Sequence, residues 1–390
     1  MDRREFFHTS ILAALAGRIL SGATLAQAPA TSPPSATRTL ILDAYSRHLH
    51  WIRNYDEIAE TTIELTCGGV QPTVQEYPGH VRPANVAQEL PAFVKTMQKH
   101  GLRVRQVRGG NQTDATAPHV EAIIGTMGHL GVTHYWMGTD NYDLSKPIMP
   151  QLDAIKLKVE RFVKLNQKHG TTLMYHTRAG AASVGSVVWD LLYVMKDFDP
   201  KHVGFHWDTG HMALHGSNMW ELLMRTAGPY VVAMSWKDRG WQQNSALPGA
   251  GGPSLGPGAS NAARGAAGAA GAPASGPPPG RSRAGAGAGA PGAGERPEGP
   301  GGARGSGGGG WSSPHVPMGT GLVDIARYAI VMRDIGFNGP MELQAEYPNG
   351  GSENGNDKLT VPRAIVIGSL KRDVLTIRAG LQQSATGLTI

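Results

Sequence analysis

The sequence predicts an α/β protein of the (β/α)8 TIM-barrel class, with a long disordered insertion after the seventh strand. Between residues 39 and 240, short strand-like runs alternate with amphipathic helical runs. A further strand and two helices follow residue 311, which completes eight β/α units. The length of 390 residues suits one such barrel with additions.

Periodicity defines each expected element. The strands are expected over residues 40–45, 69–74, 102–107, 133–137, 172–176, 203–208, 230–236 and 339–346. The helices are expected over residues 55–65, 90–100, 118–130, 150–169, 187–196, 219–227, 323–335 and 361–378. Residues 102–107 alternate apolar and polar side chains, which is the period of a strand. Strands that alternate with helices in this way favour a parallel barrel.

The interruption covers residues 247–310, which are almost entirely Gly, Ala, Pro, Ser and Arg. This segment lacks the large apolar side chains that a core needs, so it is predicted to be disordered. It lies in the loop after the seventh strand, on the face where barrels hold their active sites. A lid is one interpretation; a solvated insertion is favoured, because added loop length changes folding free energy little.

The N-terminus is predicted to be a signal peptide over residues 1–28. It contains Arg3 and Arg4, an apolar run over residues 11–20 and a small-residue cleavage site over 26–28. The run is too short for a stable membrane span. Residues 29–37 are expected to be a linker and residues 38–390 the barrel. We therefore expect recognition by twin-arginine export machinery and a periplasmic or secreted protein; a leader without function is the alternative.

Composition excludes several function classes. The net charge is +6, but part of the basic excess lies in the N-terminus and the low-complexity segment. Aromatic residues are not interleaved with basic ones, so no nucleic-acid partner is expected. Cys67 is the only cysteine, which rules out an intramolecular disulfide and a thiolate zinc cluster. The oligomeric state is not predicted by any feature of the sequence.

Polar side chains gather at the ends of neighbouring strands. Because side chains alternate along a strand, Glu342, Gln344 and Glu346 share the face that points into the barrel. The same alternation applies to the fifth, sixth and seventh strands. Together the four strands bring five polar residues to one rim: His176, Arg178, Asp208, Lys237 and Glu346. The turn after the sixth strand adds His211.

Four motifs stand at or near this rim: Asp208-Thr-Gly-His211, Ser235-Trp-Lys-Asp238, residues 316–324, and Gly339-Pro with Glu346-Tyr347. In this order and spacing they resemble the xylose isomerase-like TIM barrels called sugar phosphate isomerases/epimerases, in an exported branch. The resemblance covers residues 39–240 and 311–378. It implies one divalent ion at the rim, held by a Glu of the fifth strand, an Asp of the sixth, a His of the seventh and a Glu of the eighth. It also implies proton transfer next to a carbonyl.

The sequence departs from that family pattern at several positions. His176, Ser235 and Gln344 stand where the resemblance implies Glu, His and Glu, and Gln71 replaces an acidic residue; Asp208 is retained. In one interpretation His176, Asp208 and Glu346, with or without His211, bind a divalent metal such as Mn, Zn, Co or Fe. In the other no cofactor binds, and Arg178, Lys237 and His211 hold an anionic or polyhydroxylated ligand.

The resemblance implies a sugar isomerase or epimerase that acts on a sugar or keto-sugar by proton transfer. The expected catalytic residues are Asp208, Glu346 and His211. The expected substrate-binding residues are His80, Arg178 and Lys237. A keto-glycoside lyase or hydrolase of the same fold, and a catalytically degenerate sugar-binding barrel, remain the alternatives.

Each of these residues also has a structural interpretation. Asp208 and His211 could cap the following helix. Lys237 could form a rim ion pair with Asp238, Arg178 could pair with Glu346, and His80 could stabilise its loop.

Overall fold

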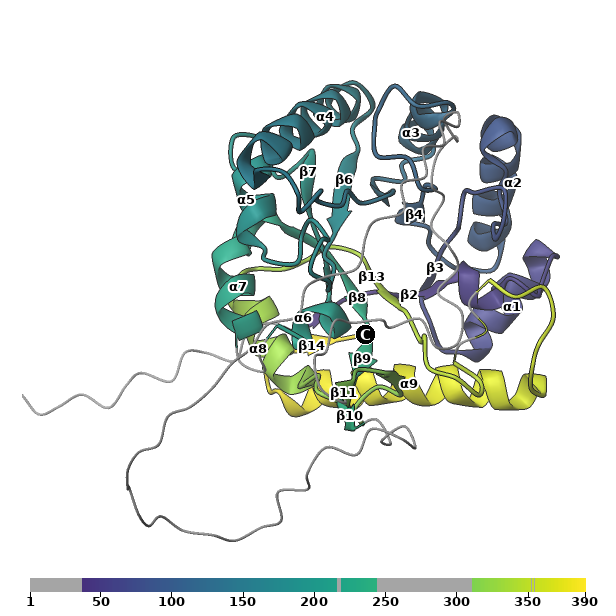
Figure 1. Cartoon of the computed structure of the whole chain (residues 1–390). Coiled ribbons are helices and arrows are strands. Elements are labelled where there is room, and N and C mark those ends of the chain that lie inside the picture. The colour runs from purple at the N-terminus through teal and green to yellow at the C-terminus, as the bar shows by residue number, and fades with distance from the viewer. Residues whose placement is uncertain (1–36, 216–218, 244–310, 352, 354) are drawn as a thin grey trace, which may run out of the picture. The chain divides into compact units, whose positions relative to one another are not determined.

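The computed structural model describes residues 37–215, 219–243, 311–351, 353 and 355–390 (Figure 1). The predicted signal peptide and insertion, and all but the last residue of the predicted linker, lie outside the described residues. Among the helices of the described part, none is long and apolar enough to cross a membrane.

Eight parallel strands form the barrel that the sequence predicts. In sheet order they are β3 (Gly69–Gln71), β2 (Leu42–Tyr45), β13 (Met341–Leu343), β8 (Val231–Trp236), β7 (Val203–Asp208), β6 (Thr172–His176), β5 (His134–Trp136) and β4 (Gln106–Arg108). Parallel bridges from Gly69 to Arg103 and from Thr73 to Arg108 join the two end strands. These bridges bring the sheet round into a barrel.

Helices surround the strands (Figure 1). They are α1 (Tyr55–Glu64), α2 (Val86–Lys99), α3 (Val120–His129), α4 (Ile148–His169), α5 (Trp189–Met195), α6 (Thr209–Ala213), α7 (Met219–Ala227), α8 (Ile325–Asp334) and α9 (Arg363–Gln383). Helix α2 begins four residues before the expected start, since Pro91 lies inside the helix instead of in its first turn. Helix α6 was not expected, and it follows directly from β7.

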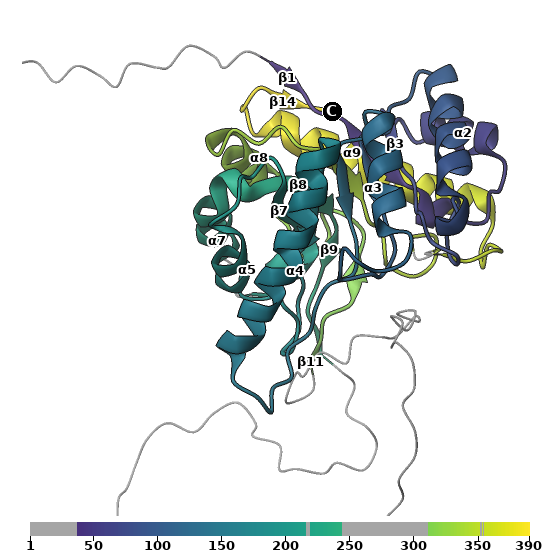
Figure 2. The same cartoon turned by 90° about the horizontal axis from the view of Figure 1, so that it is seen from above.

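Short elements complete the described chain. The single-turn 3₁₀ helices are η1 (Ser46–Leu49), η2 (Pro83–Asn85) and η3 (Gly228–Tyr230). Strands β1 (Arg38–Thr39) and β14 (Leu388–Thr389) pair in parallel, side by side in Figure 2. Strand β9 (Asp238–Arg239) pairs with β12 (His315–Val316), and β10 (Gln242–Gln243) pairs with β11 (Trp311–Ser312), both antiparallel. The two antiparallel pairs bring together the chain before and after the predicted insertion.

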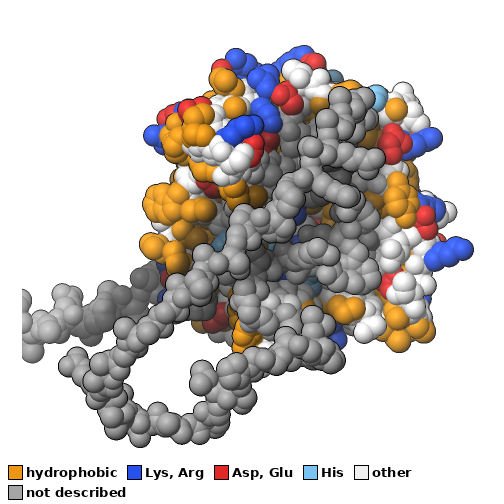
Figure 3. Space-filling model, viewed as in Figure 1, with side chains coloured by type: hydrophobic (Ala, Val, Ile, Leu, Met, Phe, Trp, Pro, Cys, Tyr) orange, Lys and Arg blue, Asp and Glu red, His pale blue; other side chains and the backbone are white. Residues whose placement is uncertain are grey.

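Two buried layers lie on opposite sides of the sheet. Phe205 and Trp207 belong to the apolar core that includes buried side chains of the surrounding helices. His206 and Asp208 alternate with them and are equally buried, so they point into the barrel. On the face shown in Figure 3, basic and acidic side chains are interspersed. The polar groups of interest are therefore inside the barrel, at the carboxyl ends of its strands.

Candidate functional site

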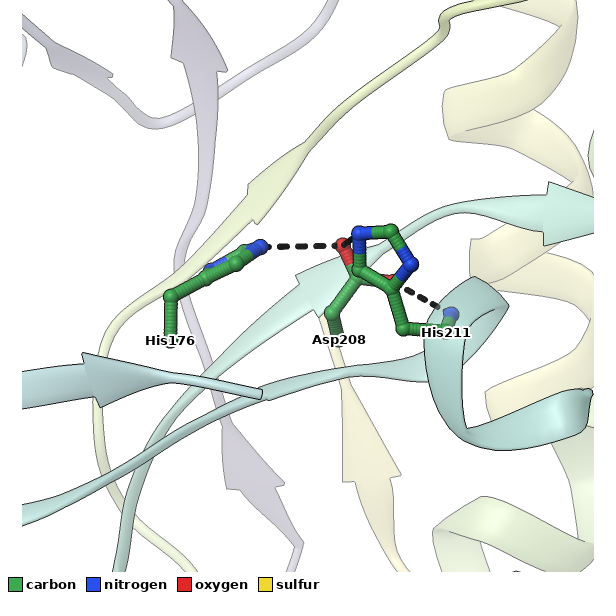
Figure 4. Close-up of side chains that lie close together, drawn as sticks. All are labelled: His176, Asp208 and His211. Carbon is green, nitrogen blue, oxygen red and sulfur yellow. Dashed lines mark hydrogen bonds and ion pairs between the residues drawn. The ribbon is translucent and has the colours of Figure 1, made fainter. Parts of the chain in front are cut away.

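Asp208 is the anchor of the site, because it ends β7 and begins α6. Its Oδ1 accepts a hydrogen bond from the backbone N–H of His211 at 2.8 Å, which caps the helix. Its Oδ2 lies 3.3 Å from His176 Nε2 and 3.8 Å from His211 Nε2 (Figure 4). The capping interpretation and the site interpretation are thus compatible, since each uses a different oxygen.

Lys237 joins the two predicted catalytic carboxylates. Its Nζ lies 3.1 Å from Asp208 Oδ2 and 3.0 Å from Glu346 Oε2, and its side chain is 3% exposed. A Cβ on Gly210 would lie 2.9 Å from Lys237 Cγ, so glycine at this turn leaves room for the lysine stem. Glu346 Oε2 is also 3.5 Å from His315 Nε2. Glu346 is therefore paired with Lys237 and lies near His315. The sequence had suggested Arg178 as its partner.

The electrostatics of the cluster keep both carboxylates ionised. Burial raises the pKa of Asp208, but His211, Lys237 and His176 together leave that pKa well below its usual range. Burial likewise raises the pKa of Glu346, and Lys237, His315 and His48 outweigh it, so this pKa is also lowered. Burial lowers the pKa of His176 to about 3. At neutral pH the site thus holds two carboxylates and a neutral His176.

Arg178 and His80, the remaining predicted site residues, contact other parts of the chain. Arg178 donates from Nε to Thr139 Oγ1 at 3.3 Å. Burial lowers the pKa of His211, and the charges of Lys237 and Arg178 lower it further. His80 lies in the loop after β3, with Nε2 3.0 Å from Ile52 O. Its ring packs 5.4 Å from that of His50. The contacts of His80 match the loop-stabilising interpretation. Asp238 accepts backbone N–H groups of Gly319, Gly321, Leu322, Val323 and Arg239.

Several residues of the barrel mouth were not among the predicted site residues, although the sequence marked Gln71 as a departure from the family pattern. Trp136, which ends β5, stacks on His176 at 4.8 Å with a 19° interplanar angle, and Arg108 lies over Trp136 at 4.4 Å. Tyr45 Oη and Gln71 Nε2 are buried and have no hydrogen-bond partner among the described residues. Each of these four residues ends a strand, and side chains at the carboxyl ends of barrel strands are expected near the active site. This position could have identified them from the sequence.

The donor set of the cluster fits a divalent cation. Ligand atoms of His176, Asp208 and His211 all lie within 4.8 Å of one another. Both ring nitrogens of His211 are buried without a hydrogen-bond partner in the described part of the chain, and such groups call for an ion or water. Imidazole and carboxylate ligands suit Mn, Fe, Co and Zn. Glu346, a predicted ligand, instead pairs with Lys237 and His315, so His211 replaces it in the candidate set.

Known structures share this fold. A D-psicose 3-epimerase from Clostridium cellulolyticum H10, solved with D-tagatose, has a TM-score of 0.52 at 11% identity, over 88% of this chain and 99% of that one. A 3-keto-D-glucoside 4-epimerase from E. coli has a TM-score of 0.51 at 10% identity, over 86% and 98%. A xylose isomerase-like TIM barrel protein from Mycobacterium smegmatis, in complex with magnesium, has a TM-score of 0.50 at 12% identity, over 88% and 98%.

Sequence comparison identifies the family. No curated protein matches the chain significantly. A family model described as xylose isomerase-like TIM barrel matches residues 57–363, which is most of the chain. The eight-stranded barrel and the polar cluster at its mouth agree with the resemblance that the motifs indicate. The chain therefore belongs to the xylose isomerase-like TIM barrel family.

Proposed function

We propose that this protein is a sugar isomerase or epimerase that moves a proton at a carbon next to the carbonyl of a sugar or keto-sugar. One observation carries the proposal: the linked side chains of His176, Asp208, Lys237 and Glu346 at the ends of four neighbouring strands. Such an arrangement places a carboxylate base, the ammonium group of a lysine and potential metal ligands next to one another. Structures of the same fold that are described as sugar 3-epimerases and a 4-epimerase support the substrate class.

Glu346 is assigned the proton transfer. Its side chain keeps 15% of its surface exposed, whereas that of Asp208 is fully buried and caps a helix. Because Lys237, His315 and His48 outweigh burial and lower its pKa, Glu346 is ionised at neutral pH, which is the form that a base requires. Lys237, 3.0 Å away, is placed to stabilise negative charge that develops on a substrate oxygen. Asp208 then orients Lys237 and His211.

His176, Asp208 and His211 would hold a divalent ion, for which Mn, Co, Zn or Fe is proposed because two ligands are imidazoles. When bound, such an ion polarises hydroxyl and carbonyl oxygens of the substrate. Tyr45 and Gln71, with their unpaired buried polar atoms, are proposed to bind sugar hydroxyls. Arg178 is proposed to bind oxygen atoms of the substrate at the same rim.

The test is product analysis with metal-loaded protein. Ketohexoses and 3-keto-glucosides are incubated with protein that carries Mn, Co, Zn or Fe, and products are separated by chromatography. Epimerised or isomerised sugar is expected, and the double variant Asp208→Ala with Glu346→Ala should form none. Product formation that survives this double substitution would refute the proton-transfer assignment.

A keto-glycoside lyase or a sugar-binding barrel are the alternatives that the same assay separates. Gln344 and Ser235 are neutral where the family resemblance implies ligands, and Gln344 Nε2 donates to Glu342 Oε1 at 3.0 Å. A lyase would release the aglycone of a 3-keto-glucoside. A binding protein would bind sugar with no change in it.

We further propose export through the twin-arginine route, supported by the sequence of residues 1–28. Export favours a non-phosphorylated substrate, because sugar phosphates are chiefly intracellular. Cell fractionation of the tagged full-length chain tests this. The variant Arg3→Lys with Arg4→Lys should remain in the cytoplasm, and export of that variant would contradict the proposal.

A further inference from the structure

We propose that two exposed tryptophans on the hairpin beside the barrel mouth, Trp241 and Trp311, bind a second pyranose ring. The substrate would then be a sugar of at least two linked rings, of which one enters the barrel. This inference rests on the proposed function, because it extends the proposed sugar site outward. It adds a binding surface that the candidate site does not include.

The hairpin that carries the two tryptophans is continuous. Strand β9 pairs with β12, and β10 pairs with β11, in one unbroken register. Between these pairs the backbone N–H of Gly240 donates to Pro314 O at 3.1 Å. Residues that are opposite each other, or two apart along a strand, share a face of such a hairpin. One face therefore carries Arg239, Trp241, Gln243, Trp311, Ser313 and His315.

This face is directed toward the proposed base. His315 Nε2 lies 3.5 Å from Glu346 Oε2. On the opposite face, Asp238 accepts backbone N–H groups from the loop before α8. The tryptophans thus lie on the same face as the histidine that reaches the site.

The spacing along the hairpin suits a ring linked to the one in the barrel. Two residues of a strand span about 7 Å, which is comparable with one pyranose ring and its glycosidic bond. Trp241 lies one such interval beyond His315 and Trp311 lies two beyond it. Figure 2 shows β11 farther out than β9, past the barrel strands. A single ring at Glu346 would leave both tryptophans uncovered, whereas a second ring linked to it reaches Trp241.

The chemistry of the face fits a sugar ring. Trp241 is 53% exposed and Trp311 is 49% exposed, and large apolar surfaces next to a site are typical of binding surfaces. An indole face packs against the C–H groups of a pyranose, while neighbouring polar atoms bind its hydroxyls. Ser313 is buried, and its Oγ has no hydrogen-bond partner in the described part of the chain, so it calls for one. Arg239 Nε donates to Ser313 O at 3.1 Å, which ties the two strands together beside Trp241.

The test compares sugars of one and two rings by calorimetric titration. The probes carry no ketone and are cellobiose, maltose and the methyl glucosides of the same linkages. At least one disaccharide should bind about 10-fold or more tightly than its methyl glucoside, because stacking on an aromatic ring adds to its affinity. The double variant Trp241→Ala with Trp311→Ala should lose this difference and keep its affinity for the methyl glucosides.

Two control variants match these substitutions. Trp189→Ala removes another exposed tryptophan, on α5, and Gln242→Ala alters the opposite face of the hairpin. Both should keep the preference for two rings. Thermal unfolding verifies that every variant is folded.

Equal affinity of the unmodified protein for one and two rings, including no binding of either, would overturn the inference. A preference that survives in the double variant would also overturn it. So would a dimer, seen by light scattering, that only the double variant loses while sugar binding is unchanged, since the tryptophans would then join two copies. Disaccharide binding through the tryptophans without epimerisation in the product assay would refute the proposed function alone. Epimerisation of ketohexoses without a preference for two rings would refute this inference alone.

Discussion

The two sides of the barrel sheet are equally buried and chemically opposite. On β7, Phe205 and Trp207 join the apolar layer beneath the helices, while His206 and Asp208 point inward, and all four side chains are fully buried. The outer layer gains free energy from apolar burial and packing. The inner layer holds charges that are tolerable only when paired. Burial alone therefore does not separate residues that build the fold from residues that equip the site.

The largest expected effect comes from the inner side. Glu346→Gln removes the proposed base, so we expect the epimerisation rate to fall by about 10²- to 10⁴-fold. Lys237 keeps its ion pair with Asp208 in this variant, so the free energy of unfolding, measured by urea denaturation, should change less than for an outer-layer truncation. Full activity in this variant would contradict the assignment of Glu346.

A substitution in the outer apolar layer should lower stability and leave the site's metal affinity unchanged. Phe205→Ala removes a fully buried ring, and we expect it to lower the free energy of unfolding by about 3–5 kcal/mol. Urea denaturation checks this. Metal affinity of the folded fraction should be unchanged, because the ring faces away from the site. A loss below about 1 kcal/mol would show that the outer layer is not the main source of stability.

Asp43 tests what an inner charge does to stability. Burial raises the pKa of Asp43 to about 7, from 3.8. The unfolded carboxyl ionises first, so the contribution of Asp43 to the free energy of unfolding falls as pH rises from about 4 to about 7 and then levels off. The Asp43→Asn variant has no carboxyl at this position, so it does not lose this part of its stability as pH rises. Its stability advantage should therefore grow by about 2–3 kcal/mol between pH 5 and pH 8. Denaturation at both pH values is the measurement, and a constant difference would contradict the raised pKa.

The smallest effect is expected from deletion of residues 247–310. Strands β10 and β11 pair with Gln243 opposite Trp311, so residues 244–246 would close a hairpin of ordinary length. We expect the free energy of unfolding to change by less than about 1 kcal/mol. A large loss on urea denaturation would show that the insertion packs on the barrel and would favour the lid interpretation.

Strand alternation predicted much of this architecture and part of the site. It placed His176 and Asp208 on inward faces, because a period of two fixes which face a side chain takes. The eighth strand was predicted to reach Glu346 but ends at Leu343, so alternation along the strand does not place Glu346. It could not predict that Lys237 reaches Glu346, since that depends on side-chain length and on the register between strands. The pairing of β7 with β8 shifts register between Phe205 and His206, which no local pattern reveals.

His315 and His206 show two further limits. His315 reaches Glu346 through the pairing of β12 with β9, across a segment whose sequence carries no pairing signal. His206 belongs to no motif, and its contacts with Glu342 and His176 follow only from the register of the strands. Sequence reasoning thus located the mouth of the barrel but not the contacts that organise it.

The most direct test of the account is solvent deuterium incorporation into sugars. The metal-loaded protein is incubated in D₂O with ketohexoses and 3-keto-glucosides, and proton NMR follows the carbon next to the carbonyl. We expect deuterium at that carbon with the unmodified protein, and none above background with Glu346→Gln. Absence of incorporation into every sugar by the metal-loaded protein, or equal incorporation by both proteins, would contradict the claim that the inner layer is a proton-transfer site.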